Sequence, residues 1–172
     1  RTAAVANSWS SITYGGGLFV AVSGGFFDIN NNRVMTSPDG INWTARISAE
    51  ASTWNTWAST ANQWTSVAYG KGMFVAVSGN GTDRLMTSPN GINWTIRTSP
   101  FSGSTRPSVA FGNDYSGGVF YILPNDSPYP TISGGGTCSP PDGTTFSSDG
   151  IYWMCKGTAW AWPLGINNWR SL

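Results

Sequence analysis

One pattern of short apolar runs and polar turns is written twice in this chain and a third time in weaker form. In the first unit, residues 10–14 alternate, residues 18–22 are apolar throughout, and two further runs follow at 33–36 and 41–44. The second unit repeats these runs at 65–69, 73–77, 84–87 and 92–95, and the third keeps 107–112, 119–123 and 146–153. Runs this short, separated by glycine and proline turns, predict one four-stranded antiparallel meander per unit.

The second run of each unit is the most informative for the fold. It is apolar at every position, which predicts a strand that is buried on both faces. A lone meander leaves one face wet, whereas stacked sheets cover each other on both sides. The pattern therefore predicts an all-β fold of about three meanders packed as the blades of a β-propeller. A β-trefoil, which is also built from three four-stranded units, is the alternative.

The repeat indicates that residues 1–172 form a single domain. We expect the end of a preceding blade at 1–8, blade one at 9–48, an insertion at 49–63, blade two at 64–105, blade three with insertions at 106–168, and the start of the next blade at 169–172. Propellers have four to eight blades, so three units predict part of a larger propeller. Either a longer chain or several copies would complete it.

The amino-acid composition narrows the range of partners and ligands to be expected. Only 10% of the residues are charged and the formal net charge is +1, so we expect no nucleic-acid partner. No apolar stretch is long enough to span a membrane. The chain has no His and only two cysteines, so neither a metal site nor a cofactor is expected. Cys138 and Cys155 both lie in the third unit. They are expected either to form a disulfide, which would favour an oxidising location, or to be two free thiols.

The residues needed for catalysis are not evident. An acyl-transfer triad usually needs a His base, and Glu50 is the single Glu of the chain. Glycoside hydrolysis needs two carboxylates on one bond, and no such pair stands out. The arginines recur at equivalent positions of the repeat, as structural residues would: Arg33, Arg46, Arg84 and Arg97. The sequence predicts no catalytic residues and no enzyme activity.

The segments that interrupt the repeat are the candidates for ligand contact, because loops on a rigid scaffold often carry function. They are rich in aromatic residues beside Asn, Asp and Thr, a combination that suits a sugar ring and its hydroxyl groups. The alternative is that these rings pack over blade edges or against another subunit. The candidates are Phe26, Phe27, Trp54, Trp57, Trp160 and Trp162.

The turn of each unit resembles the Asp-box, or bacterial neuraminidase repeat, of β-propellers. The resemblance covers nearly the whole chain and extends to repeat proteins of bacteriophage tails and fibres and to exported bacterial proteins. It implies that the motif is a structural turn, with Asn90 in place of Asp in the second unit. The matching residues are Ser37, Asp39, Gly40 and Trp43; Ser88, Asn90, Gly91 and Trp94; and Ser147, Asp149, Gly150 and Trp153.

Together these observations predict a non-catalytic propeller module of an extracellular or virion surface protein, used for assembly or attachment. Its partners would be other blades or subunits of the same assembly. The alternative is a lectin that binds a cell-surface glycan, and a glycosidase is the more remote one.

Overall fold

The computed structural model describes residues 2–25, 31–49, 62–81, 83–99, 106–112, 118–123, 145–150 and 154–155. These residues form twelve strands in three separate four-stranded sheets, all antiparallel. The described part of the chain contains no helix. The all-β prediction is confirmed, as is the prediction of one meander per unit, because each strand pairs with the next one in sequence.

The first sheet contains β1 (Trp9–Gly15), β2 (Leu18–Ser23), β3 (Val34–Ser37) and β4 (Thr44–Arg46). The second contains β5 (Trp64–Gly70), β6 (Met73–Ser78), β7 (Leu85–Ser88) and β8 (Thr95–Arg97). The third contains β9 (Ser108–Gly112), β10 (Val119–Leu123), β11 (Thr145–Ser147) and β12 (Met154–Cys155). The first and second sheets have the same pairing register, position for position.

The first hairpin of each of these two sheets closes through two residues with positive φ. In the first sheet they are Gly16 (φ 56°) and Gly17 (φ 79°), and in the second Lys71 (φ 47°) and Gly72 (φ 76°). Two consecutive positive φ values characterise a type I′ turn, whose twist matches that of the flanking strands. Lys71 therefore adopts a conformation that glycine would adopt at lower cost.

The fourth strands begin later than the sequence predicts. The runs 41–44 and 92–95 were expected to be strands, but β4 begins at Thr44 and β8 at Thr95. The side chain of Asp39 accepts hydrogen bonds from the amides of Ile41 and Asn42, and this keeps both residues in the turn. Asn90 does the same in the second unit. Local side-chain bonds to the backbone thus compete successfully with the sheet ladder.

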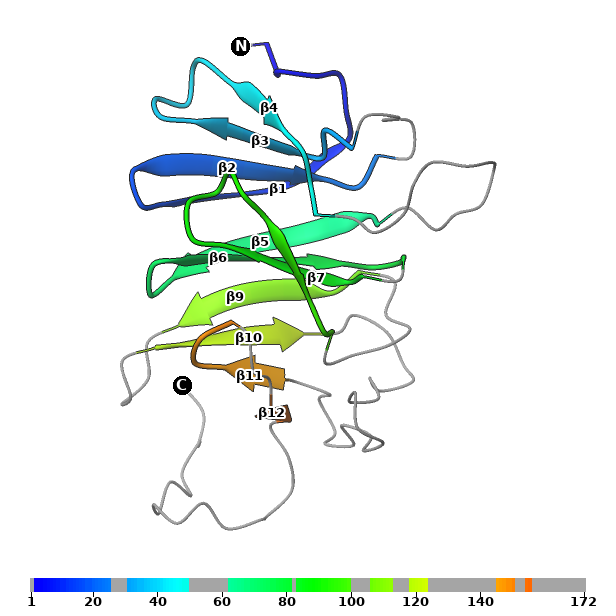
Figure 1. Ribbon diagram of the computed structural model, residues 1–172, viewed down its shortest axis with the longest axis vertical. Helices are drawn as coiled ribbons and strands as arrows, with labels where there is room; N and C mark the ends of the chain where they lie inside the picture. The colour runs from blue at the N-terminus through cyan, green and yellow to red at the C-terminus, as the bar shows by residue number, and fades with distance from the viewer. Residues whose placement is uncertain are drawn as a thin grey trace, which may run out of the picture.

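The three sheets are stacked in sequence order, with the second between the first and the third (Figure 1). One apolar cluster lies between the first and second sheets, around Val20, Val22 and Phe74. A second cluster lies between the second and third, around Val75, Val77 and Phe120. The second sheet therefore contributes to two cores, as the apolar run 73–77 within β6 predicts. The described strands form no closed barrel of the kind that a β-trefoil requires.

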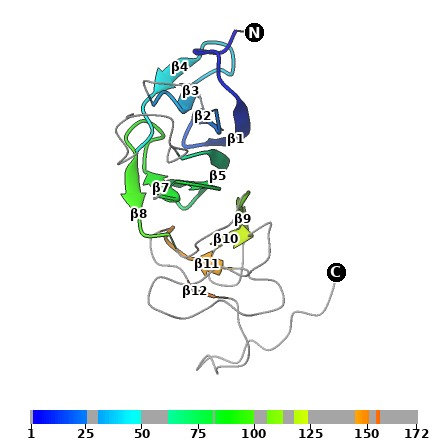
Figure 2. The same ribbon diagram turned by 90° about the vertical axis from the view of Figure 1, so that its right-hand side faces the viewer.

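The sheets approach one another most closely along their first strands. β1 contacts β5, and β5 contacts β9. Figure 2 shows these first strands along one side of the stack, while the fourth strands β4 and β8 lie well separated along the other. The stack therefore fans out from its first strands towards its fourth strands.

Candidate functional site

The turn between the third and fourth strands is built around two side chains. The Ser37 hydroxyl donates to Asp39 Oδ1 (2.9 Å) and accepts from the amide of Gly40 (2.8 Å). Asp39 Oδ1 accepts from the amides of Ile41 and Asn42, each at 2.8 Å. The indole Nε1 of Trp43 donates to the carbonyl of Gly40 (3.3 Å). The four residues that the sequence marks as a turn motif are therefore joined in one hydrogen-bond network.

Most of this network recurs in the second unit, and its serine–aspartate–glycine part recurs in the third. Asn90 Oδ1 accepts from the amides of Ile92 and Asn93 (both 2.9 Å), and Trp94 Nε1 donates to the carbonyl of Gly91 (3.1 Å). In the third unit, Ser147 Oγ donates to Asp149 Oδ1 (3.0 Å) and accepts from the amide of Gly150. Trp153 lies outside the described residues. An amide oxygen can replace a carboxylate oxygen here because the turn needs only an acceptor.

The electrostatics of Asp39 fit this structural role. The backbone amides of Asn42 and Ile41, then the side chains of Asn42 and Ser37, hold the pKa of Asp39 well below the ordinary aspartate value. Hydrogen bonds to the charged form of a carboxyl group have this effect. A group that is ionised throughout the neutral range, and whose oxygens are engaged by its own turn, is poorly suited to general acid–base catalysis.

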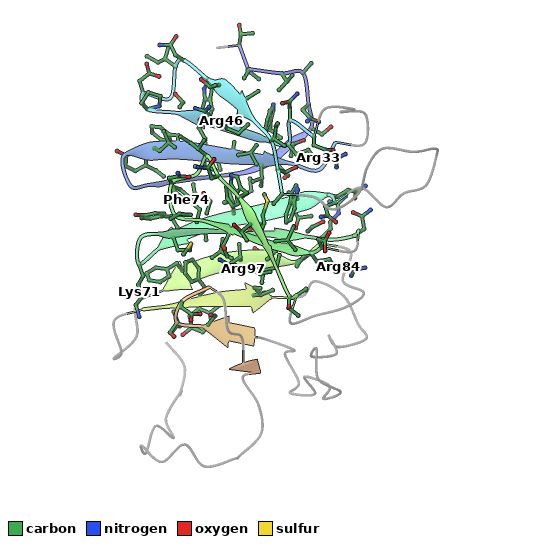
Figure 3. All side chains as sticks on the ribbon, viewed as in Figure 1. Arg33, Arg46, Lys71, Phe74, Arg84 and Arg97 are labelled. Atoms are coloured by element: carbon green, nitrogen blue, oxygen red, sulfur yellow. The ribbon has the colours of Figure 1, made fainter. Side chains whose placement is uncertain are left out.

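The repeated arginines also bind within the scaffold. Arg46 Nε donates to Thr36 Oγ1 (3.1 Å), and Arg97 Nε donates to Thr87 Oγ1 (2.9 Å) at the equivalent place one sheet on. Arg33 is fully buried and donates from Nη1 to the carbonyl of Asn62. Figure 3 shows Arg33 and Arg46 in the first unit and Arg97 in the second, without the convergence on one point that an anion site would need.

The contacts between sheets form a second repeated arrangement, which the sequence analysis did not identify. The back face of a sheet is the one towards the next sheet along the chain, and the front face is the one towards the preceding sheet. The Ser11 hydroxyl accepts from the amide of Val67 (3.2 Å), and the Ser66 hydroxyl accepts from the amide of Val109 (3.1 Å). First strands are sheet edges, whose unpaired amides need such acceptors.

Aromatic rings provide the second contact of this arrangement. A Cβ atom at Gly15 would overlap the ring of Tyr69, and one at Gly70 would overlap the ring of Phe111. Tyr69 and Phe111 occupy the same position in consecutive units, one residue before the end of the first strand. Each ring thus lies on the glycine that ends the first strand of the preceding sheet, where a larger residue would not fit.

The turn glycines provide the third contact. A Cβ atom at Gly91 would lie 2.8 Å from Val20 Cγ2, and one at Gly150 would lie 2.7 Å from Val75 Cγ2. Val20 and Val75 are equivalent positions on the back faces of the first and second sheets. The serine bridge, the ring on glycine and the turn glycine on valine together form what we call the inter-sheet joint, which occurs twice.

The front face of the first sheet carries equivalent side chains, but no described sheet lies against them. Ile12 is 57% exposed and Tyr14 58% exposed, whereas Val67, which is equivalent to Ile12, is only 5% exposed. Trp9 is likewise partly exposed, while its equivalent Trp64 is fully buried. This surface is the candidate functional site. The repeat alone does not mark this surface, because the burial of the equivalent residues Trp64 and Val67 one unit later is visible only in the structure.

The residues proposed from the sequence as ligand contacts all fall outside the described part of the chain. They are Phe26, Phe27, Trp54, Trp57, Trp160 and Trp162. Cys138 and the side chain of Cys155 also fall outside it, so their pairing stays a prediction. Within the described ranges, no group of three or more His, Cys, Asp or Glu residues could hold a metal ion. Those ranges also contain no helix long and apolar enough to cross a bilayer.

No protein-family model matches the sequence, and no curated protein matches it significantly. The sheets and the contacts between them are therefore the basis for inferring the function.

Proposed function

We propose that the three sheets are blades of a larger β-propeller, which serves as a non-catalytic module for assembly or attachment in an extracellular or virion surface protein. The observation that carries this proposal is the inter-sheet joint. It is made from the same kinds of residues twice over, and its front half recurs on the open face of the first sheet.

The arrangement of the sheets supports a propeller over a straight stack. Contacts between sheets concentrate along β1, β5 and β9, while the fourth strands diverge (Figure 2). In a propeller the first strand of each blade lies nearest the central axis and the last lies at the rim. The positions of acid and base groups support a structural module. Asp39 and Asp149 belong to turns, and Arg46 and Arg97 each donate to a threonine of their own sheet.

Electron microscopy of the assembly that contains this chain tests the propeller. We expect disc-shaped particles with a central channel, and class averages without a ring would contradict the proposal. The proposed role in assembly or attachment is tested by incubating the labelled protein with the surface or particle that carries the native protein. Saturable binding, without turnover of chromogenic glycosides, is expected. Glycoside hydrolysis that is lost when a single Asp or Glu is substituted would contradict the non-catalytic role.

A further inference from the structure

The two open faces of the stack carry complementary halves of the inter-sheet joint. At the front of the first sheet, Tyr14 occupies the position of Tyr69 and Phe111, and Gly40 occupies the position of Gly91 and Gly150. Tyr14 contacts Phe19 of its own sheet (ring centroids 4.6 Å apart), and its ring is otherwise largely exposed. This face therefore presents the ring and the turn glycine of the joint.

The back of the third sheet presents the other half. Ser108 is equivalent to Ser11 and Ser66, and it is exposed. Gly112 is equivalent to Gly15 and Gly70, but the nearest atom to a Cβ there belongs to Tyr121 of the same sheet, at 3.5 Å. Leu123, at the position of Val22 and Val77, is 48% exposed. Serine, glycine and an apolar side chain thus occur in the same order as on the two back faces that are covered.

We infer that the front face of the first sheet binds the back face of the third sheet in a second copy of this chain. In this complex Tyr14 of one copy lies on Gly112 of the other, and Ser108 accepts from the amide of Ile12. The turn glycine Gly40 meets the ring of Tyr121, which replaces the valine of the other two joints. The inference rests on the proposed propeller, since it names what completes the ring.

The direction of the joint determines the assembly. A front-to-back contact is heterologous, so it closes into a ring when the rotation between units allows it and otherwise continues as a filament. Sheets that fan out from their first strands favour closure. Counting only the three sheets that the structure describes in each copy, a dimer brings six together, which is within the four to eight blades of known propellers, and a trimer brings nine. The expected species is a closed dimer with two identical joints between copies.

Two substitutions test the two halves of the joint separately. Tyr14→Ala removes the ring from the front face, and Gly112→Ala adds a methyl group where that ring would lie. Gly112→Ala fits within one copy because its contact with Tyr121 is of ordinary length. Each variant affects both joints of the ring, so the dissociation constant should rise about 100-fold, about tenfold for each joint. Ile92→Ala, which truncates an exposed apolar side chain away from both faces, is the matched control and should leave association unchanged.

Sedimentation equilibrium over a micromolar concentration series gives the measurement, and circular dichroism checks that each variant is folded. A mixture of the two variants is the decisive sample. Pairing the intact back face of the Tyr14→Ala copy with the intact front face of the Gly112→Ala copy restores one joint, so the mixture should associate more strongly than either variant alone. Ile12→Lys, at an exposed position, provides a second front-face variant if Tyr14→Ala fails to fold.

Three results would overturn the inference: a monomeric chain, a dimer insensitive to Gly112→Ala, or variants that do not complement each other. Failure here is distinguishable from failure of the proposed function. Ring-shaped particles in the native assembly, together with a chain that stays monomeric on its own, would keep the propeller and exclude the second copy. The lack of any ring by electron microscopy would remove the propeller itself.

Discussion

The ring of Tyr69 lies on Gly15, at the place where any other residue would carry its Cβ atom. One sheet supplies the aromatic side chain and the preceding sheet supplies the glycine, so the fit depends on both units of the repeat. Phe111 and Gly70 repeat the relationship one sheet further along. The contact explains why β1 and β5 each end in glycine, beyond the needs of the hairpin that follows.

Replacing Gly15 with alanine should destabilise the protein by about 1–3 kcal/mol, because the methyl group overlaps Tyr69 near the base of its ring and the core must shift. Urea unfolding followed by tryptophan fluorescence measures the change. Gly24→Ala is the matched control, since its nearest contact is the Trp64 carbonyl at an ordinary 3.6 Å. Equal urea midpoints of unfolding for the two variants would show that the contact between Gly15 and Tyr69 does not contribute to stability.

Replacing Ser66 with alanine should cost about 1–3 kcal/mol of unfolding free energy. The hydroxyl accepts from the buried amide of Val109 and also donates to its carbonyl, so the substitution leaves both groups without a partner from this side chain. Chemical denaturation of Ser66→Ala and Ser8→Ala, which removes an exposed hydroxyl, gives the comparison. The idea of a serine bridge would be wrong if both substitutions proved equally mild.

The ionisation of Asp39 should make the stability depend on pH at acid values. Its pKa is lower in the folded than in the unfolded state, so its contribution is fully present above the unfolded pKa of about 4. The contribution is lost as the pH falls through the folded-state pKa. Contributions that the wild type and Asp39→Asn share cancel in a comparison, so the difference in unfolding midpoint between the two proteins isolates Asp39. That difference should be constant above about pH 5 and should move in favour of Asp39→Asn below about pH 4. A difference that stays constant down to pH 2 would contradict the prediction.

Replacing Lys71 with glycine should stabilise the protein by about 0.5–1 kcal/mol. Lys71 has a φ of 47°, and relief of this left-handed conformation outweighs the greater freedom that glycine has in the unfolded chain. Thermal unfolding of Lys71→Gly and Lys71→Ala makes the test, because alanine shortens the side chain while keeping the strain. A gain for both variants would attribute the effect to the lysine side chain and not to the backbone.

The strand order could be read from the sequence because the units repeat almost letter for letter. The apolar run at β6 predicted burial on both faces, and the structure places that strand between two apolar clusters. The start of the fourth strand was predicted wrongly. Ile41 and Asn42 begin the run 41–44 that was predicted to be a strand. The hydrogen bonds from their amides to Asp39 keep them in the turn instead.

The candidate surface was missed because sequence does not show which repeated positions are covered. Ile12 and Val67 are nearly the same residue in the same place, and they differ only in the neighbour that lies against them. The partner of Tyr69 is a glycine, a residue more readily explained by its turn than by a ring from another sheet. A contact that is possible because glycine has no side chain is difficult to predict from the sequence.

The middle sheet is the only described one with a neighbour on both sides, and this gives the molecule a direction of unfolding. Interactions in stacked repeats act chiefly between adjacent units, so fraying should begin at the two flanks and reach the centre last. Amide protons of β6, including those of Val75 and Val77, should exchange with solvent more slowly than those of β2 or β10. Any sheet added at a flank would shift this protection outward.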